Sequence, residues 1–214
     1  MSNTPRRALL VIDVQNEYFT GGLRIAYPPA EDSLRRIGQA MRAARSAGIP
    51  IVRVLHDSPE GAPLFAQGSA TWQPHPALVD EAVDHVVHKA RASAFAGTDL
   101  GGWLDARGID TVTVAGYMTH NCDAATIFEA LSRGLQAEFL SDASGSPAYR
   151  NAAGHASAEE IHRVFCTVFH SNFAAVATTE DWIEAVGAGR ALDRDNILLS
   201  VRRAADPAAA LQRG

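Results

Sequence analysis

Short apolar runs alternate with longer segments of helical periodicity along this chain. Residues 8–12 are a continuous apolar run and residues 112–114 are a short β-branched run, and both are typical of strands buried on both faces of a parallel sheet. Residues 30–47 repeat apolar positions every three to four residues and stop before Gly48 and Pro50, so they predict a helix. Further strands are expected at 51–55, 84–89, 136–140 and 174–177, and further helices at 99–106, after residue 122, at 156–170 and at 180–186.

Candidate caps mark the ends of several of these helices. Thr98 and Thr179 precede the helices at 99–106 and 180–186, and a hydroxyl oxygen at such a position accepts a free N–H of the first turn. Thr119 or Asn121 is a candidate cap for the helix after residue 122, and Gly134 is its expected stop.

The alternation of strands and helices predicts one doubly wound α/β domain. We expect a mainly parallel, six-stranded, Rossmann-like sheet in the order 3-2-1-4-5-6, with right-handed crossovers and helices on both faces. The domain is expected over residues 1–190, and 191–214 form a C-terminal tail that is a candidate for packing on a neighbouring subunit. The first strand is not followed by G-x-G-x-x-G, so a dinucleotide site is poorly supported.

Composition narrows the partners and the compartment. The 214 residues carry a formal net charge of −5 and no dense Lys/Arg cluster, which argues against a nucleic-acid partner. The apolar runs are of strand length, so no membrane span is expected, and residues 1–7 lack the apolar core of a signal peptide. Two cysteines make no disulfide framework, and we expect a cytoplasmic protein.

Three chemically unusual residues follow or end predicted strands: Asp13, Lys89 and Cys122. In the predicted order, the first and fourth strands are neighbours at the switch point, where open α/β sheets bind ligands. Asp13 and Cys122 would therefore meet, and Lys89 has the length to reach them from the third strand. Such a set can run acyl transfer: the amine stabilises the two anions, the acid moves protons and the sulfur attacks a carbonyl.

Cys122 has two interpretations on the sequence alone. At a strand-to-helix turn the helix dipole favours the thiolate, and neighbouring N–H groups can hold an oxyanion. A lone thiol in such a place is equally well a small buried apolar residue. Cys166 lies at helical spacing beside Phe165 and Phe169, so a buried structural thiol is the better interpretation there.

Aromatic residues and a long loop supply candidate walls for a pocket. Residues 58–76 are rich in Gly and Pro without periodicity, and loops of this length are usually functional. For Phe19 and Trp72, packing under a loop is the alternative to contact with substrate. A core position is the alternative for Tyr117, and a surface role is favoured for His120. The expected pocket residues are Gln15, Tyr18, Phe19, Trp72, Phe95 and Tyr117.

Three segments in this order resemble the isochorismatase-like cysteine hydrolases, which include nicotinamidases and N-carbamoylsarcosine amidase. They read L-L-V-I-D-V-Q-N-E-Y-F, H-K-A-R-A-S-A-F-A-G-T-D-L and V-A-G-Y-M-T-H-N-C-D-A-A-T, and the resemblance spans residues 8–186. It implies Asp13 as general acid and base, Lys89 as charge partner and Cys122 as nucleophile.

The resemblance also implies a backbone feature beside the nucleophile. A non-proline cis bond is expected between Tyr117 and Met118, and the N–H groups of Met118 and Cys122 would form the oxyanion hole. The family implies a homo-oligomer, either a dimer or a tetramer.

Departures from relatives refine the expected chemistry. Nicotinamidases of this family carry a metal-binding D-x-H motif after the second strand. Here that place reads His56-Asp57-Ser58, with His75 as the only later histidine of the loop, so we expect no metal and no organic cofactor. Isochorismatases that cleave a vinyl ether lack the cysteine, so Cys122 disfavours that reaction.

The prediction is therefore a cysteine-dependent hydrolase that cleaves a small amide, ureido or lactam-type C–N bond through a thioester. Two alternatives remain open: a non-catalytic member of the fold, and one that uses Cys122 for redox chemistry.

Overall fold

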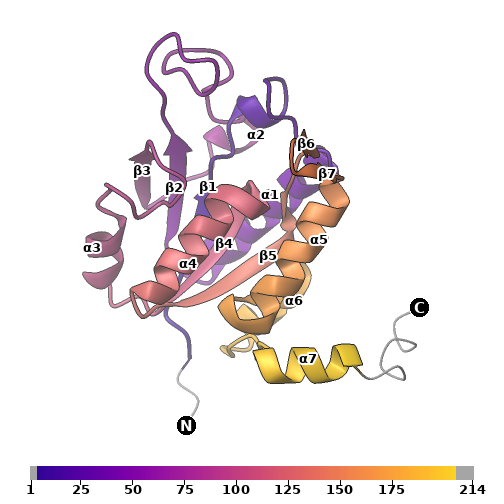
Figure 1. Cartoon of the computed structure of the whole chain (residues 1–214). Coiled ribbons are helices and arrows are strands. Elements are labelled where there is room, and N and C mark those ends of the chain that lie inside the picture. The colour runs from indigo at the N-terminus through magenta and orange to yellow at the C-terminus, as the bar shows by residue number, and fades with distance from the viewer. Residues whose placement is uncertain (1–3, 206–214) are drawn as a thin grey trace.

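A six-stranded, wholly parallel sheet forms the centre of the computed structural model, which describes residues 4–205 (Figure 1). Its strand order is β3-β2-β1-β4-β5-β8. This is the predicted order 3-2-1-4-5-6, because β6 and β7 belong to a separate sheet and β8 is the sixth strand of this one. Apolar runs form the middle strands because both of their faces are covered. The strands are β1 (Arg7–Ile12), β2 (Ile51–His56), β3 (His85–Lys89), β4 (Thr111–Tyr117), β5 (Gln136–Gly145) and β8 (Ala175–Ala177).

Helices cover the two faces of this sheet and separate the core into two apolar clusters. One face carries α1 (Ala30–Ser46) and α6 (Thr179–Gly187), and the buried residues of α1 recur at helical spacing, as in Leu34, Ile37 and Met41. The opposite face is covered by α3 (Leu100–Asp105), α4 (Ala124–Ser132) and α5 (Ala158–Val168).

Close contact between the two central strands depends on a glycine. Gly116 of β4 has a φ of +119°, and a Cβ at this position would lie 2.0 Å from the carbonyl oxygen of Ile12. Any side chain would push β4 away from β1 just where both strands approach the candidate site.

Several elements were absent from the sequence prediction. Strand β5 continues to Gly145, beyond the predicted end at 140, and leads into a hairpin of β6 (Tyr149–Asn151) and β7 (Gly154–Ala156). Short turns also appear, as does a helix within the predicted tail. These are η1 (Asn16–Tyr18), α2 (Pro76–Val79), η2 (Thr119–Asp123), η3 (Phe169–Phe173) and α7 (Ile197–Ala205).

The predicted caps are partly wrong. Thr178, not Thr179, caps α6, its hydroxyl accepting the N–H of Asp181 at 3.1 Å. Thr98 lies one residue before the N-cap of α3 but still accepts the Leu100 N–H at 3.3 Å. No side chain caps η2 or α4, whereas Gly134, with a φ of +83°, follows α4 as expected.

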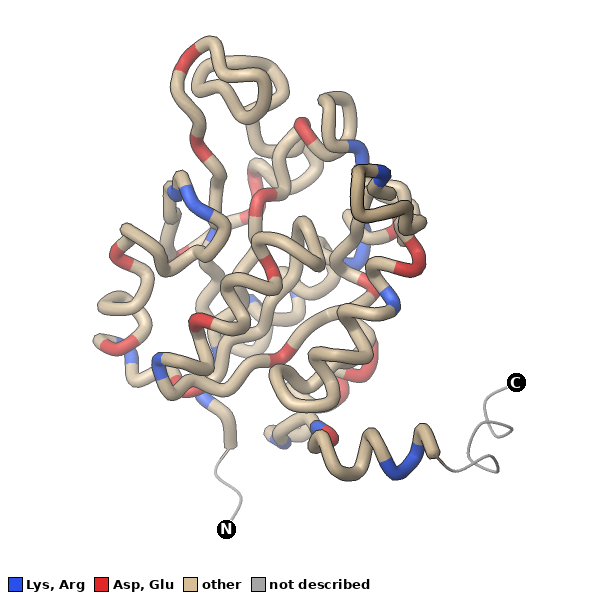
Figure 2. The backbone as a smooth tube through the Cα atoms, viewed as in Figure 1, with Lys and Arg blue, Asp and Glu red and all other residues tan. Residues whose placement is uncertain are grey.

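The charges and the hydropathy of the helices can be followed along the described chain. Acidic and basic residues are interspersed along the described backbone (Figure 2). Within residues 4–205, no helix is both long enough and apolar enough to cross a bilayer.

Candidate active site

The ends of three strands bring Asp13, Lys89 and Cys122 together, and these three residues are called the triad below. Asp13 directly follows β1, and its N–H donates to the carbonyl oxygen of Val54 in β2 at 2.9 Å. Lys89 is the last residue of β3, and its side chain reaches across β2. Its Nζ lies 2.7 Å from a carboxylate oxygen of Asp13 and donates to Cys122 Sγ at 3.2 Å.

All three groups are withdrawn from solvent, and their charges depend on one another. Burial alone lowers the pKa of Lys89, but the attraction of Asp13 and Cys122 outweighs it and raises the pKa overall. Burial raises the pKa of the Cys122 thiol, Asp13 adds to the rise, and Lys89 opposes it. These shifts favour a charged ammonium on Lys89 and a neutral thiol on Cys122.

The raised pKa of Cys122 opposes the effect of the helix dipole, which by itself favours the thiolate. The helix dipole acts on Cys122, but the thiol is only 4% exposed, and an anion there would lose its hydration beside the negative charge of Asp13. Burial also raises the pKa of Cys166, to about 12. A difference in resting ionisation thus gives no reason for Cys122 to react faster than Cys166, so nucleophilicity requires a base beside the sulfur.

Asp13 is placed to be that base. Its carboxylate, Cys122 Sγ and a ring nitrogen of His56 each lie within 4.8 Å of one another. Apart from the ion pair with Lys89, neither oxygen of Asp13 has a hydrogen-bond partner within the described part of the chain. A buried carboxylate with unused acceptor capacity can take up a proton without breaking existing hydrogen bonds.

His56 is a further member of the site that the sequence interpretation treated as a loop residue. It ends β2, and its Nδ1 lies 3.1 Å from Lys89 Nζ. Burial, with a contribution from Lys89, lowers the pKa of His56, so the neutral ring accepts a hydrogen bond from the ammonium. The signal that could have revealed it is the one used for Lys89: a polar residue at the carboxyl end of a central strand.

The same cluster bears on metal binding. Asp13, His56 and Cys122 offer a carboxylate, an imidazole and a sulfur, which are zinc ligands, but the Lys89 ammonium contacts all three at 2.7, 3.1 and 3.2 Å. A cation between them would have to displace a buried positive charge. With Lys89 in place, the set of Asp13, His56 and Cys122 therefore does not fit a resident metal.

The residues at the place of the D-x-H motif do not form a ligand set either. The two Asp57 oxygens accept from Trp72 Nε1 at 2.8 Å and pair with His88 Nδ1 at 2.9 Å. His75 Nδ1 accepts the N–H of Ala77 at 3.2 Å and caps α2. These side chains are engaged in holding the loop.

The backbone around Cys122 has the expected form. The Tyr117–Met118 peptide bond is cis, and Met118 directly precedes η2, which carries Cys122 into α4. Thr126 Oγ1 donates to the Cys122 carbonyl oxygen at 2.7 Å and accepts the N–H of Ala94 at 3.0 Å. The turn bearing Cys122 is thereby tied to the loop that follows β3.

Two expected pocket residues have structural roles. The Gln15 amide is fully buried and bonds to the backbone of His56 and Trp72, so it ties β2 to the long loop. Tyr117 points into the core, where its hydroxyl lies 2.7 Å from Ser33 Oγ. Both orientations differ from the expected contact with substrate, because each polar group has found a partner inside the protein.

Of the other four, Tyr18 borders the triad most directly. Burial, Asp13 and Cys122, in that order, raise its pKa well above the ordinary value, and its ring packs against Phe65 and Tyr117. Phe95 is buried in the apolar cluster that contains Cys122.

Phe19 and Trp72 lie in the loop region as the sequence suggested. The ring of Phe19 is 4.2 Å from that of His75, centroid to centroid, and Trp72 is held by its bond to Asp57. Both side chains are partly exposed, so they pack under the loop and also face outward.

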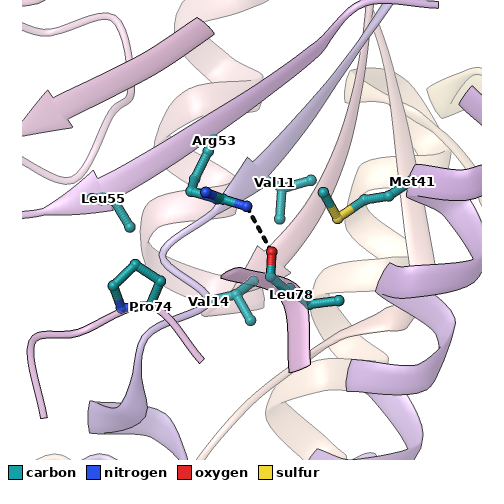
Figure 3. A pocket seen from close by; sticks show the side chains of 7 residues that line it. All are labelled: Val11, Val14, Met41, Arg53, Leu55, Pro74 and Leu78. Carbon is teal, nitrogen blue, oxygen red and sulfur yellow. Dashed lines mark hydrogen bonds between the residues drawn. The ribbon is translucent and has the colours of Figure 1, made fainter. Parts of the chain in front are cut away.

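A small cavity near the end of β1 is separate from the triad (Figure 3). Its volume of about 10 Å³ admits at most one water molecule. Arg53 Nη2 donates to the carbonyl oxygen of Leu78 at 2.6 Å across it, which anchors the end of α2. The cavity is lined by Val11, Val14, Met41, Arg53, Leu55, Pro74 and Leu78.

Comparison with known proteins identifies the family of this chain. Residues 7–181 match the model of the isochorismatase domain. The chain belongs to the isochorismatase family. The family match begins with β1 and ends within α6, so it includes all three strands whose ends form the triad.

Several proteins with isochorismatase-type or amidohydrolase names are similar to this chain in sequence or structure. The crystal structure of an isochorismatase-type protein from Burkholderia xenovorans LB400 is 59% identical, with a TM-score of 0.94 over 95% of this chain and 98% of that one. A secreted isochorismatase effector of Verticillium dahliae is 34% identical over 67% of this chain and 75% of its own length. A ureidoacrylate amidohydrolase of Methylorubrum extorquens is 30% identical over 68% of this chain and 73% of its own length.

Proposed function

We propose that this protein is a cysteine-dependent amidohydrolase that acts on a small amide, ureido or lactam-type C–N bond. The observation that carries the proposal is the buried contact of one ammonium with both a carboxylate and a thiol, at 2.7 and 3.2 Å. A vinyl ether hydrolase has no use for a thiol at this position, whereas acyl transfer from an amide requires a nucleophile, a base and an anion-stabilising charge.

The steps of the proposed reaction follow from the resting charges. Asp13 takes the proton of the Cys122 thiol as the sulfur attacks the substrate carbonyl, and the Lys89 ammonium stabilises the sulfur while it is anionic. The N–H groups of Met118 and Cys122 are the proposed donors to the tetrahedral oxyanion.

The C–N bond then breaks, and the proton held by Asp13 passes to the departing nitrogen. The product is a thioester on Cys122 and a free amine or ammonia. Asp13, again a carboxylate, next removes a proton from water as the water attacks the thioester. The C–S bond breaks, the acid product leaves, and Asp13 returns the proton to the sulfur of Cys122.

The substrate class is supported by the relatives and by the residues around the triad. The Methylorubrum extorquens relative is named as a ureidoacrylate amidohydrolase, which is an enzyme of amide-type bonds. Tyr18, Phe19, Phe95 and Trp72 are the proposed apolar surroundings of the substrate. Gln15 and Tyr117 are proposed to support this region from behind.

A panel of small amides and ureas tests the proposal. We expect release of ammonia or amine by the wild type and a loss of about 10⁴-fold or more in Cys122→Ala, with Cys166→Ala as the matched control that keeps its activity. An aldehyde that forms a thiohemiacetal on Cys122 would give independent evidence. Absence of turnover and of the aldehyde adduct would favour a non-catalytic protein, and oxidation of Cys122 without turnover would favour the redox alternative.

We also propose that the domain of residues 1–190 forms a homo-oligomer in which the C-terminal segment packs on a neighbouring subunit. Helix α7 has no buried residue and exposes Ile197, Leu198 and Val201 by 57–61%. An apolar face of this kind is unfavourable in water unless another surface covers it. Sedimentation should show a smaller assembly for Leu198→Glu than for the wild type, and an unchanged assembly for the control Arg202→Gln.

A further inference from the structure

The hairpin of β6 and β7 places a phenol against the turn that carries the nucleophile. Tyr149 Oη lies 2.8 Å from His120 Nε2 and 3.9 Å from Met118 Sδ, so it contacts two residues of the segment 118–122. The side chain is 39% exposed, and the pKa of Tyr149 is raised by burial and by the nearby Cys122. None of the proposed catalytic steps uses this hydroxyl.

His120 connects this phenol to a second hydroxyl. Its Nδ1 lies 2.7 Å from Ser146 Oγ, which directly follows β5, and its ring meets that of Tyr149 edge to face at 4.9 Å. His120, for which the sequence favoured a surface role, is therefore part-buried between two hydroxyl groups. Burial lowers its pKa to about 4, so at neutral pH the ring is uncharged and carries a single N–H.

The single ring proton determines which way the hydrogen bonds point. In the tautomer that carries the ring proton on Nε2, the Ser146 hydroxyl donates to His120 Nδ1. In that tautomer the Nε2–H group donates to Tyr149 Oη, and this is the arrangement on which the proposal below rests. The phenolic hydrogen is left for another acceptor, and the one nearby is the thioether sulfur of Met118 at 3.9 Å, which is a weak acceptor.

We propose that Tyr149 is a substrate-binding residue that donates a hydrogen bond to a carboxylate or second carbonyl carried next to the scissile C–N bond. The inference rests on the proposed function and narrows its substrates to small amides and ureas that bear such an acceptor. His120 and Ser146 are positioning residues, because they direct the phenolic hydrogen without contacting substrate. A stronger acceptor entering the site replaces the weak contact with Met118.

A pair of matched substrates tests this assignment. N-carbamoylglycine carries a carboxylate, and isobutylurea replaces it with an apolar group of the same shape. For Tyr149→Phe we expect kcat/KM on N-carbamoylglycine to fall about 10- to 100-fold, mainly through KM, because a hydrogen bond to a charged acceptor is lost. Isobutylurea should be unaffected, and His155→Gln, on the partner strand of the same hairpin, should leave both substrates unchanged.

An alkylation experiment gives a readout that needs no amide turnover. The rates at which 3-bromopropionate and its apolar isostere 1-bromo-3-methylbutane modify Cys122 are measured by mass spectrometry. The rate with 3-bromopropionate, divided by the rate with 1-bromo-3-methylbutane, should fall several-fold in Tyr149→Phe and by a smaller factor in Ser146→Ala. Ser146→Thr keeps the hydroxyl and should have the same ratio as the wild type.

The outcomes separate the two levels of proposal. A reduced ratio without turnover of any amide supports Tyr149 as an acceptor-binding residue and counts against the amidohydrolase proposal. An equal ratio in the wild type and in folded Tyr149→Phe overturns the role of Tyr149, whether or not amides are hydrolysed.

Discussion

Strand β1 has a buried ion pair at each end, and the two pairs differ in how completely they are hydrogen-bonded. At the amino end, Arg7 Nη2 lies 2.8 Å from Glu138 Oε1, with both side chains 3–4% exposed. At the carboxyl end, Lys89 Nζ lies 2.7 Å from Asp13, with both side chains fully buried. Distance and burial are therefore nearly equal.

The surroundings of the two carboxylates are not equal. Glu138 accepts from two nitrogens of Arg7, from Trp182 Nε1 at 2.9 Å and from Thr113 Oγ1 at 2.7 Å. Among the residues described, the Asp13 carboxylate has the Lys89 ammonium as its only polar partner. The fully bonded pair stabilises one conformation of the sheet, whereas the incompletely bonded pair retains the capacity to accept a proton from a thiol or from water.

The largest expected effect breaks the pair at the catalytic end. Asp13→Asn should lower amide turnover about 10²- to 10⁴-fold, because the leaving nitrogen no longer receives a proton. Alkylation of Cys122 by iodoacetamide near neutral pH should change much less, because the loss of the base is offset by the loss of a negative charge beside the thiol, which lowers its pKa. A parallel fall in both rates would show that Asp13 acts only by forming the nucleophile.

Removing the positive partner at the other end should affect folding rather than chemistry. Arg7→Met leaves Glu138 buried without a counter-charge and should lower the free energy of unfolding by about 3–5 kcal/mol, measured by urea denaturation. Turnover per folded molecule should stay the same. The control is Arg45→Met, which removes an exposed pair with Asp84 and should cost less than about 1 kcal/mol.

Another buried carboxylate, Asp123, forms no ion pair within residues 4–205 and gives a pH-dependent test. Ser144 donates to one of its oxygens, and burial raises its pKa from 3.8 to about 7. The folded protein keeps this proton after the unfolded chain has lost it, so the stabilisation from this group is complete below about pH 4 and disappears as the pH rises to about 7.

Asp123→Asn removes that dependence. The variant should be more stable than the wild type above pH 7, by an amount on the order of a few kcal/mol, and the difference should vanish near pH 4. Thermal unfolding across this range measures it. A difference that is independent of pH would mean that folding does not change the pKa of Asp123.

The smallest expected effect concerns the helix that brings a donor to Glu138. Thr178→Ala removes the cap of α6, which carries Trp182, and should lower the free energy of unfolding by about 1 kcal/mol. Thr178→Ser keeps the hydroxyl and should restore most of the loss in the same denaturation experiment. Equal losses in the two variants would contradict the capping role.

Most of the fold and the core of the candidate site could be predicted from the sequence. Uninterrupted apolar runs identify buried parallel strands, and the alternation with helices determines their order, which the structure confirms. Because the strands are parallel, their carboxyl ends share one edge of the sheet. Polar residues at those ends, Asp13 and Lys89, were therefore predicted to meet Cys122, and the geometry places them in contact.

Only the tertiary structure decided the protonation of Cys122, the inward direction of Tyr117, and the place of His56 beside Lys89. It also decided that Tyr149 would lie against the nucleophilic turn. Local sequence encodes periodicity and turn chemistry, which act over a few residues. Loss of hydration and the pairing of buried polar groups depend on atoms brought together from distant parts of the chain, so they are determined only when the whole domain has packed.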